Sequence, residues 1–155
     1  MFKSLLVVAT FFILQMPSNA QSTSELTIKS GETLHSFTVE IADTDDLRRL
    51  GLMNRETLDE NAGMLFDYEQ SQSVNMWMKN TLLSLDMFFI DEAGQVLGIA
   101  RNAAPHSERR IGIGAPVRAV LELNAGSAAK LGINPGDTVV HTLFNNTDIL
   151  ANPSP

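Results

Sequence analysis

The segment Val74–Thr81 contains the residues best suited to binding a ligand. It holds the only tryptophan of the chain, with a lysine and two asparagines close beside it. In an extended backbone alternate side chains point to opposite faces, so Asn75, Trp77 and Lys79 share one face. An aromatic platform beside a cation and amides is typical of a small-ligand or sugar-binding surface. The alternative is structural: Trp77 covers a second apolar layer and Lys79 pairs with Asp86 across a turn.

The methionines of the same segment offer a second chemistry. Met76 and Met78 would project to the side opposite Trp77, and thioether sulfur is a suitable ligand for Cu(I). Methionine also fills gaps in hydrophobic cores, and this packing role is the favoured interpretation. The three histidines stand far apart in the sequence and lack the spacing of metal ligands. No metal site is predicted, with Met76 and Met78 kept as the alternative.

Enzyme motifs are absent from the sequence. It contains no G-x-S-x-G elbow, no H-E-x-x-H pair, no P-loop and no dinucleotide-binding fingerprint. Asp86 and Glu122 form a hypothetical carboxylate pair for a carbohydrate hydrolase, which requires roughly 5 to 9.5 Å between the two groups. We therefore expect no cofactor, assign no catalytic residue, and favour a binding or accessory module over an enzyme.

The first twenty residues have the order of a cleavable signal peptide. Lys3 precedes the apolar stretch Leu5–Met16, and small residues follow at Ser18 and Ala20. The apolar stretch is shorter than the roughly 20 residues that span a bilayer, which disfavours a permanent anchor. We predict cleavage near Ala20 and a periplasmic or secreted protein. The chain has no cysteine, which excludes disulfides, thiol chemistry and a cysteine-linked lipid anchor.

Charge and length further narrow the classes of protein to which this chain can belong. The 155 residues carry a formal charge of −7, and removal of residues 1–20 leaves ten basic and eighteen acidic residues, a charge of −8. Such a chain offers no electrostatic attraction to nucleic acid or anionic lipid. The remaining 135 residues suit one domain, which we place at 25–145, followed by a disordered tail at 146–155. We expect a monomer whose partner is a small polar or carbohydrate-like ligand.

Short strands dominate the predicted elements. Apolar residues alternate with polar ones over 36–42, which predicts a half-buried strand. Thr44 and Gly51 bound a short helix with acidic residues in its first turn and basic residues in its last, and Leu47 and Leu50 would turn one face of that helix inward. Further strands are predicted over 64–68, 74–79, 85–91, 95–101, 116–123 and 137–144, with a turn at 91–94 and a second helix over 125–131. This pattern predicts a mainly β fold, a sandwich or barrel-like mixed sheet with two short helices, and α+β is the alternative.

The sequence resembles the family known as domain of unknown function 192. The resemblance rests on ordered motifs between about Phe37 and Val140: Val39–Ala42, residues 48–55 (Arg-x-x-Gly-Leu-Met-x-Arg), Gly63–Phe66, Trp77–Thr81, Leu85–Asp86, Val120–Gly126 and Gly136–Asp137. The resemblance implies a compact, mainly β domain of a kind that is often exported. It implies no established activity. The family often has an aromatic residue just before the tryptophan, where this chain has Met76.

Several polar residues at these motif positions are hard to explain by packing, and with Trp77 they form the candidate ligand-binding site: Arg48, Arg55, Lys79, Asn80, Asp86 and Glu122. The functional hypothesis is that Arg55, Lys79 and Asn80 line an anion- or polyol-accepting cleft beside Trp77. The competing interpretation is that the charged residues form salt bridges within the fold. On that interpretation Glu122, if partly buried, needs a cationic partner.

Overall fold

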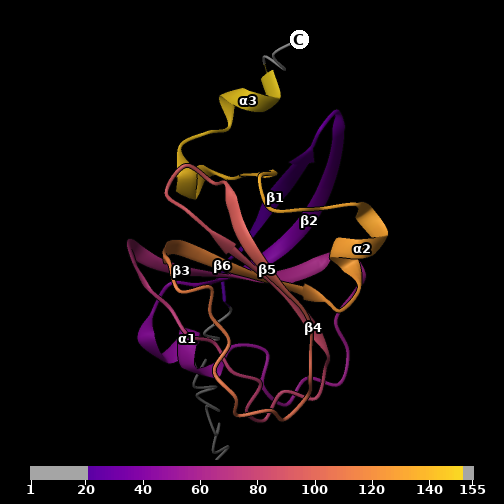
Figure 1. Ribbon diagram of the computed structural model, residues 1–155, viewed down its shortest axis with the longest axis vertical. Coiled ribbons are helices and arrows are strands. Elements are labelled where there is room, and N and C mark those ends of the chain that lie inside the picture. The colour runs from indigo at the N-terminus through magenta and orange to yellow at the C-terminus, as the bar shows by residue number, and fades with distance from the viewer. Residues whose placement is uncertain (1–20, 152–155) are drawn as a thin grey trace, which may run out of the picture.

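Seven strands form one curled mixed sheet in the computed structural model, which describes residues 21–151 (Figure 1). The strands are β1 (Thr23–Ser30), β2 (Thr33–Ala42), β3 (Ala62–Ser73), β4 (Leu85–Ile90), β5 (Val96–Ala103), β6 (Pro116–Asn124) and β7 (Thr138–Val140). Their order across the sheet is β5-β4-β6-β3-β2-β1-β7, and only β2 and β3 are parallel. The predicted mainly β class is confirmed, in the form of a half-barrel. The predicted signal peptide lies outside the described residues.

The curl brings the two edges of the sheet together at one end. Gln95, which directly precedes β5, bridges to Thr138 of β7. Beside this bridge the Val96 N–H donates to the Asp137 carbonyl at 2.9 Å, and the Val139 N–H donates to the Gly94 carbonyl at 2.7 Å. The predicted turn at 91–94 is confirmed, and it joins the antiparallel strands β4 and β5 at this junction, where Gly94 adopts φ 88°.

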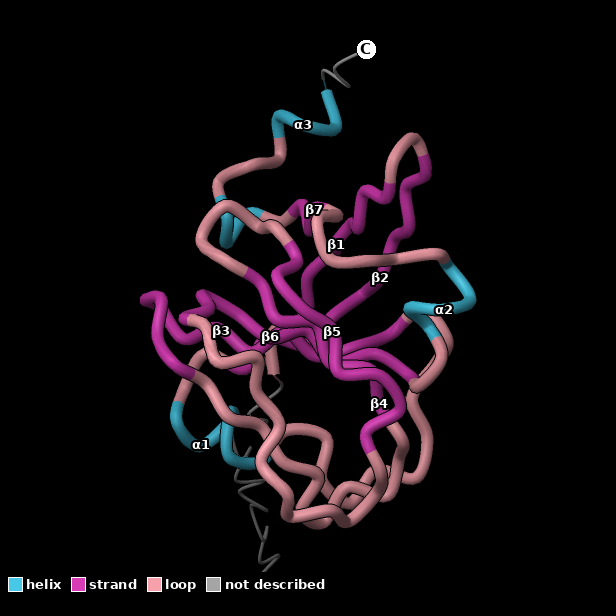
Figure 2. Tube along the Cα trace, viewed as in Figure 1, coloured by secondary structure: helices cyan, strands magenta, loops and turns pink. Residues whose placement is uncertain are grey.

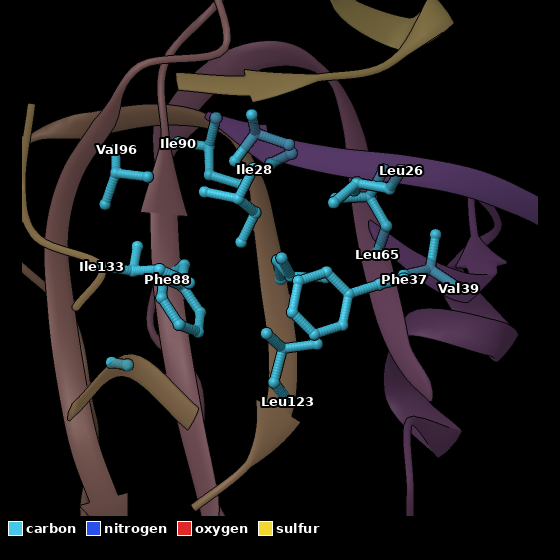
Figure 3. Packing of buried hydrophobic residues seen from close by; sticks show 14 of the residues in the cluster. Leu26, Ile28, Phe37, Val39, Leu65, Phe88, Ile90, Val96, Leu123 and Ile133 are labelled. Carbon is cyan, nitrogen blue, oxygen red and sulfur yellow. The ribbon is translucent and has the colours of Figure 1, made fainter. Parts of the chain in front are cut away.

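Each face of the sheet carries its own hydrophobic core. The inner core lies within the curl and is built from residues of all seven strands and of the C-terminal segment, including Leu26, Phe37, Phe88 and Leu123 (Figure 3). The outer core lies on the other face and includes Met64, Phe66, Met87 and Val120. Because side chains alternate along a strand, each central strand contributes to both cores. The outer core underlies the candidate site.

Short helices cover the two faces. Helix α1 (Asp45–Leu50) belongs to the connection between the parallel strands β2 and β3, because a parallel pair requires a crossover. Thr44 caps it by accepting from the Leu47 N–H at 3.2 Å, and Gly51 ends it with φ 50°. Both ends agree with the prediction. Leu47 packs on the outer core as expected, whereas the side chain of Leu50 is 51% exposed, so the expectation that it turns inward is wrong.

The C-terminal third adds helix α2 (Ser127–Leu131), a 3₁₀ turn over Thr142–Phe144 and helix α3 (Asp148–Ala151). The described part of the chain thus has three α-helices rather than the two predicted. Asn146 is buried and donates to the Val139 and Ala93 carbonyls at 2.9 and 3.0 Å. Ordered contacts therefore continue past residue 145, and residues 152–155 lie outside the description.

Two further differences from the sequence prediction concern strands. Strand β1 lies outside the predicted set and pairs with β2 along its whole length. The predicted strand over 74–79 is instead an extended connection with a single bridge, between Met76 and Ile111. Long connections gather with α1 at the end of the sheet away from the β1–β2 hairpin (Figure 2). Within residues 21–151, no helix combines the length and apolarity needed to cross a membrane.

Candidate functional site

The sheet register places Asp86 and Glu122 on opposite faces. Strands β4 and β6 pair so that Asp86 lies opposite Leu123 and Met87 lies opposite Glu122. Cross-strand partners share a face, so Asp86 points to the inner core and Glu122 to the outer core. The hypothetical carboxylate pair is therefore wrong, because a sheet separates the two groups.

Asp86 has a structural role that accounts for its burial. Its side chain is fully buried, and its two oxygens accept the N–H groups of Asn102 at 2.8 Å and Ala128 at 2.9 Å. Ala128 is in the first turn of α2, where the capping residue Gly126 offers no side-chain acceptor. Asp86 thus caps α2 from a distant strand. The predicted pair with Lys79 does not form, since Asp86 faces the inner core.

Arg55 is also committed to a partner. Its guanidinium makes a two-pronged pair with the Glu40 carboxylate, through Nη1 to Oε1 and through Nη2 to Oε2 at 2.7 Å. The hydrogen bond from Arg55 lowers the pKa of Glu40, with burial acting in the opposite direction. Arg55 does not line any of the hollows around Trp77, so it is not brought together with Lys79 and Asn80.

Trp77 lies between two shallow hollows, which together we call the Trp77 cleft. One has a volume of about 340 Å³, and its lining includes Tyr68, Asn75 and Arg110. The other has a volume of about 430 Å³, and its lining includes Met53, Lys79 and Asn80. Trp77 and Arg49 belong to both. Here the extended segment keeps the predicted alternation, because Val74, Met76 and Met78 are buried while the Trp77 side chain is 38% exposed.

The cations of the Trp77 cleft differ in how firmly they are held. Arg48 is fixed, because it bonds to Asp45 at 2.7 Å and to the carbonyls of Asp43 and Asp67 at 2.7 and 2.5 Å. Arg49 makes a looser pair with Asp46 at 3.4 Å. Lys79 lies 5.3 Å from the centre of the Trp77 ring, close enough for a cation–π contact.

Lys79 and Arg110 have no ion-pair partner anywhere in residues 21–151. Four basic and two acidic residues therefore line the Trp77 cleft: Arg48, Arg49, Lys79, Arg110, Asp45 and Asp46. The cleft is a locally basic region of an acidic protein, whose formal charge is −7.

A small cavity lies beneath the Trp77 cleft, and Glu122 forms part of its wall. We call it the Glu122 cavity. It has a volume of about 20 Å³, roughly the space of one or two water molecules. Arg49, Leu50, Met53 and Trp77 line both this cavity and the cleft above it. The inner cavity and the outer cleft are thus neighbouring parts of one site.

Glu122 is nearly inaccessible, with 4% of its surface exposed. Its carboxyl group makes no side-chain hydrogen bond or salt bridge to the described part of the chain, so the predicted cationic partner is absent there. Burial raises the pKa of Glu122 to about 8. The carboxyl group is consequently neutral near pH 7 and can donate a hydrogen bond.

Tyr68 connects the cleft wall with the outer core. Its hydroxyl donates to the Met76 sulfur at 3.2 Å, and the guanidinium of Arg48 lies 5.6 Å from its ring centre. Burial raises the pKa of Tyr68 to about 12, and the nearby Glu122 adds to this effect. Tyr68 therefore stays neutral and serves as a rigid wall.

The methionines favour packing over metal binding. Met76, Met78 and Met64 are buried in the outer core, where they contact apolar neighbours. Among residues 21–151 no three His, Cys, Asp or Glu side chains come together as a set of metal ligands. The packing interpretation of Met76 and Met78 accounts for their positions.

Sequence reasoning missed three residues that the structure places in the cleft wall: Arg49, Tyr68 and Arg110. The sequence could have indicated Arg49, since it is adjacent to Arg48 on the short helix. It gave no indication of Tyr68 and Arg110, because these residues are more than forty positions apart in the sequence and only the fold brings them together. Of the predicted residues, the structure brings together Arg48, Trp77, Lys79, Asn80 and Glu122, and it places Arg55 and Asp86 elsewhere.

Comparison with known proteins supports the resemblance seen in the motifs. The family model of domain of unknown function 192, described as an uncharacterised ACR, matches residues 26–141. A crystal structure of a candidate transcription regulator from Sinorhizobium meliloti 1021 is 41% identical, with a TM-score of 0.78, and the match covers 79% of this chain and 96% of that one.

A protein of unknown function from Novosphingobium aromaticivorans DSM 12444 is 36% identical, with a TM-score of 0.77. That match covers 81% of this chain and 90% of the other. No curated protein matches this chain.

Proposed function

Since this chain belongs to the family of domain of unknown function 192, for which no activity is described, we propose its function from the geometry of the Trp77 cleft. The protein is a binding module for a small ligand that carries a carboxylate on a ring or sugar-like body. The observation that supports this is the position of a partly exposed Trp77 between two hollows whose cations include the unpaired Lys79 and Arg110.

The chemistry of the cleft selects the ligand class. An exposed indole face stacks on the apolar face of a ring, and Leu50 and Met53 extend that apolar surface. Lys79 and Arg110, which are not neutralised by carboxylates, favour an anionic group over a cationic one. A sugar acid or a muropeptide presents a ring face and a carboxylate together, whereas a neutral sugar presents only the ring.

The Sinorhizobium protein is described as a candidate transcription regulator. For this chain, binding of DNA in such a role receives less support. The formal charge of this chain is −7, and nucleic-acid binding requires an extended basic face. The basic residues of the Trp77 cleft are interspersed with Asp45 and Asp46. We therefore favour a small anion as the ligand.

Fluorescence provides a direct test because Trp77 is the only tryptophan. We expect galacturonate and N-acetylmuramate to change the emission with a saturable dose response. Galactose and N-acetylglucosamine, which have the ring without the carboxylate, should bind at least tenfold more weakly. Lys79→Ala should weaken the acids roughly five- to tenfold, the equivalent of about 1 kcal/mol for one partly exposed ion pair.

Lys130→Ala is the matched control for that test. Lys130 is an exposed lysine paired with Glu60 outside the cleft, so its loss should leave the titration unchanged. If none of the four compounds changes the emission of the wild type, or if Lys130→Ala weakens binding as much as Lys79→Ala, the cleft is not the binding site.

We also propose that the module functions outside the cytoplasm, in the periplasm or as a secreted protein. This proposal rests on the order of residues 1–20, in which Lys3, an apolar stretch and small residues at Ser18 and Ala20 follow one another. The mature protein recovered from cells should begin at Gln21, as determined by mass spectrometry of its N-terminal peptide. A mature N-terminus at Met1 would contradict export by this route.

A further inference from the structure

Glu122 is a buried ionisable residue whose carboxyl group has no side-chain hydrogen bond or salt bridge within the described residues. An ionised carboxylate in this position is unfavourable, and even a neutral carboxyl loses its hydrogen bonds to water. Buried polar groups normally have a hydrogen-bond partner, so an unpartnered one requires an explanation. Glu122 also borders a cavity, which means that a partner from outside the chain can reach its carboxyl group.

The surroundings of Glu122 decide which partner fits. From α1 the charged groups are Arg48 and Arg49, and from β3 the ionisable group is Tyr68. The other elements at this point offer uncharged side chains: Met64 of β3 and Met87 of β4 as cross-strand neighbours, and Met76, Trp77 and Thr81 of the connecting segment. Within the described residues the groups at the cavity are thus cationic or neutral.

A cationic ligand group fits these surroundings poorly. An ammonium group entering from the Trp77 cleft would pass Arg49 and Lys79, and like charges repel each other. A carboxylate oxygen, in contrast, is attracted by the same cations and needs a hydrogen-bond donor at its inner end. The cavity volume of about 20 Å³ admits the tip of such a group and excludes a ring.

We propose that the Glu122 cavity is the inner subsite of the Trp77 cleft, where the neutral Glu122 carboxyl donates its O–H to an oxygen of the ligand's carboxylate. The ligand's ring stays outside on Trp77. This inference rests on the proposed function, since it assigns an acidic ligand to the same cleft. No covalent bond forms or breaks, and the shared proton remains on Glu122 unless the solution pH removes it.

Proton exchange on binding provides the test. At pH 8 about half of the free protein has an ionised Glu122, so binding of a carboxylate to the neutral form must take up roughly half a proton from the buffer. At pH 6 the uptake should be close to zero. We would measure it by calorimetric titration of galacturonate in phosphate and in Tris, whose heats of ionisation differ.

Two variants separate donation by Glu122 from a merely structural effect. Glu122→Gln keeps an N–H donor that does not titrate, so its affinity should stay within a few-fold of the wild type at pH 6. Its affinity should also remain constant to pH 9, while that of the wild type falls up to about tenfold per pH unit above 8. Glu122→Ala removes the donor and should weaken binding roughly five- to tenfold at pH 6. Circular dichroism of each variant verifies that it is folded.

The outcomes distinguish the two proposals. If galacturonate and N-acetylmuramate bind with proton release or with no proton exchange at pH 8, the inner subsite is wrong and the cleft stands. If the affinity of Glu122→Gln depends on pH in the same way as that of the wild type, the inner subsite is likewise rejected and the proposed cleft is retained. If neither acid binds the wild type at any pH from 5 to 9, both the cleft and its inner subsite are rejected.

Discussion

Replacing Asp86 by alanine is expected to lower the free energy of unfolding by roughly 3 kcal/mol or more. The substitution leaves the buried N–H of Ala128 and the partly buried N–H of Asn102 without an acceptor, and a stranded buried donor costs about 1–3 kcal/mol. It also removes the side-chain acceptor that caps the start of α2, since Gly126 supplies none. Against a typical stability of 5–15 kcal/mol, this is a large loss.

Urea unfolding followed by circular dichroism measures this effect. Asp137→Ala is a matched control, because Asp137 also accepts a backbone N–H, from Asn134 at 2.8 Å, but in a partly exposed turn. Its loss should cost less than about 1 kcal/mol, since water can replace the acceptor. Equal losses in the two variants would show that Asp86 is not a buried cap.

Replacing Glu122 by glutamine should stabilise the protein increasingly as the pH rises. Burial raises the pKa of Glu122 from 4.5 to about 8, so folding takes up a proton between these two values. The stability supplied by this group is fully present below pH 4.5 and is lost as the pH rises towards 8. Glutamine stays neutral, so at pH 8 the variant should be more stable by an amount on the order of 4 kcal/mol.

The difference between the two proteins, measured by urea unfolding from pH 5 to pH 8, isolates Glu122 from other titrating groups. His141 illustrates the need for this, because burial lowers its pKa and makes stability fall on acidification, the opposite direction. That contribution is common to both proteins and cancels. If the two stability curves run parallel over this range, Glu122 is ionised in the folded state and the proposed inner subsite loses its donor.

The sequence predicts structure best where the determining contacts are local. Helix α1 has its capping side chain at Thr44 and its stop at Gly51, both within the same ten residues, and the structure has these ends. The structure of the segment around Trp77 was predictable only in part. Its alternating burial was predictable because an extended backbone turns successive side chains to opposite sides. Its lack of strand neighbours was not, since pairing depends on Ile111 and Ser107, some thirty residues away.

The division of the candidate site follows the same logic. Asp86 and Glu122 are both acidic residues in motifs, and residue type alone does not show that they lie on different faces of the sheet. Their faces are set by the register of β4 against β6, in which Met87 rather than Asp86 is opposite Glu122. A shift of one residue would reverse the faces. Register is a property of two strands, and here the paired residues, from Ile90 with Ala119 to Leu85 with Asn124, are distant in the sequence, so no local pattern reports it.

The pairing of β1 with β7 has a consequence for how this chain acquires its fold. Thr27–Lys29 meet Thr138–Val140, so the strand nearest the start of the described chain has no outer neighbour until nearly the whole polypeptide is available. Contacts that span such distances raise the contact order and slow folding. A ribosome-bound chain that ends before residue 138 therefore lacks the strand that completes the sheet. The complete sheet is therefore expected to form only once the C-terminal segment has been synthesised.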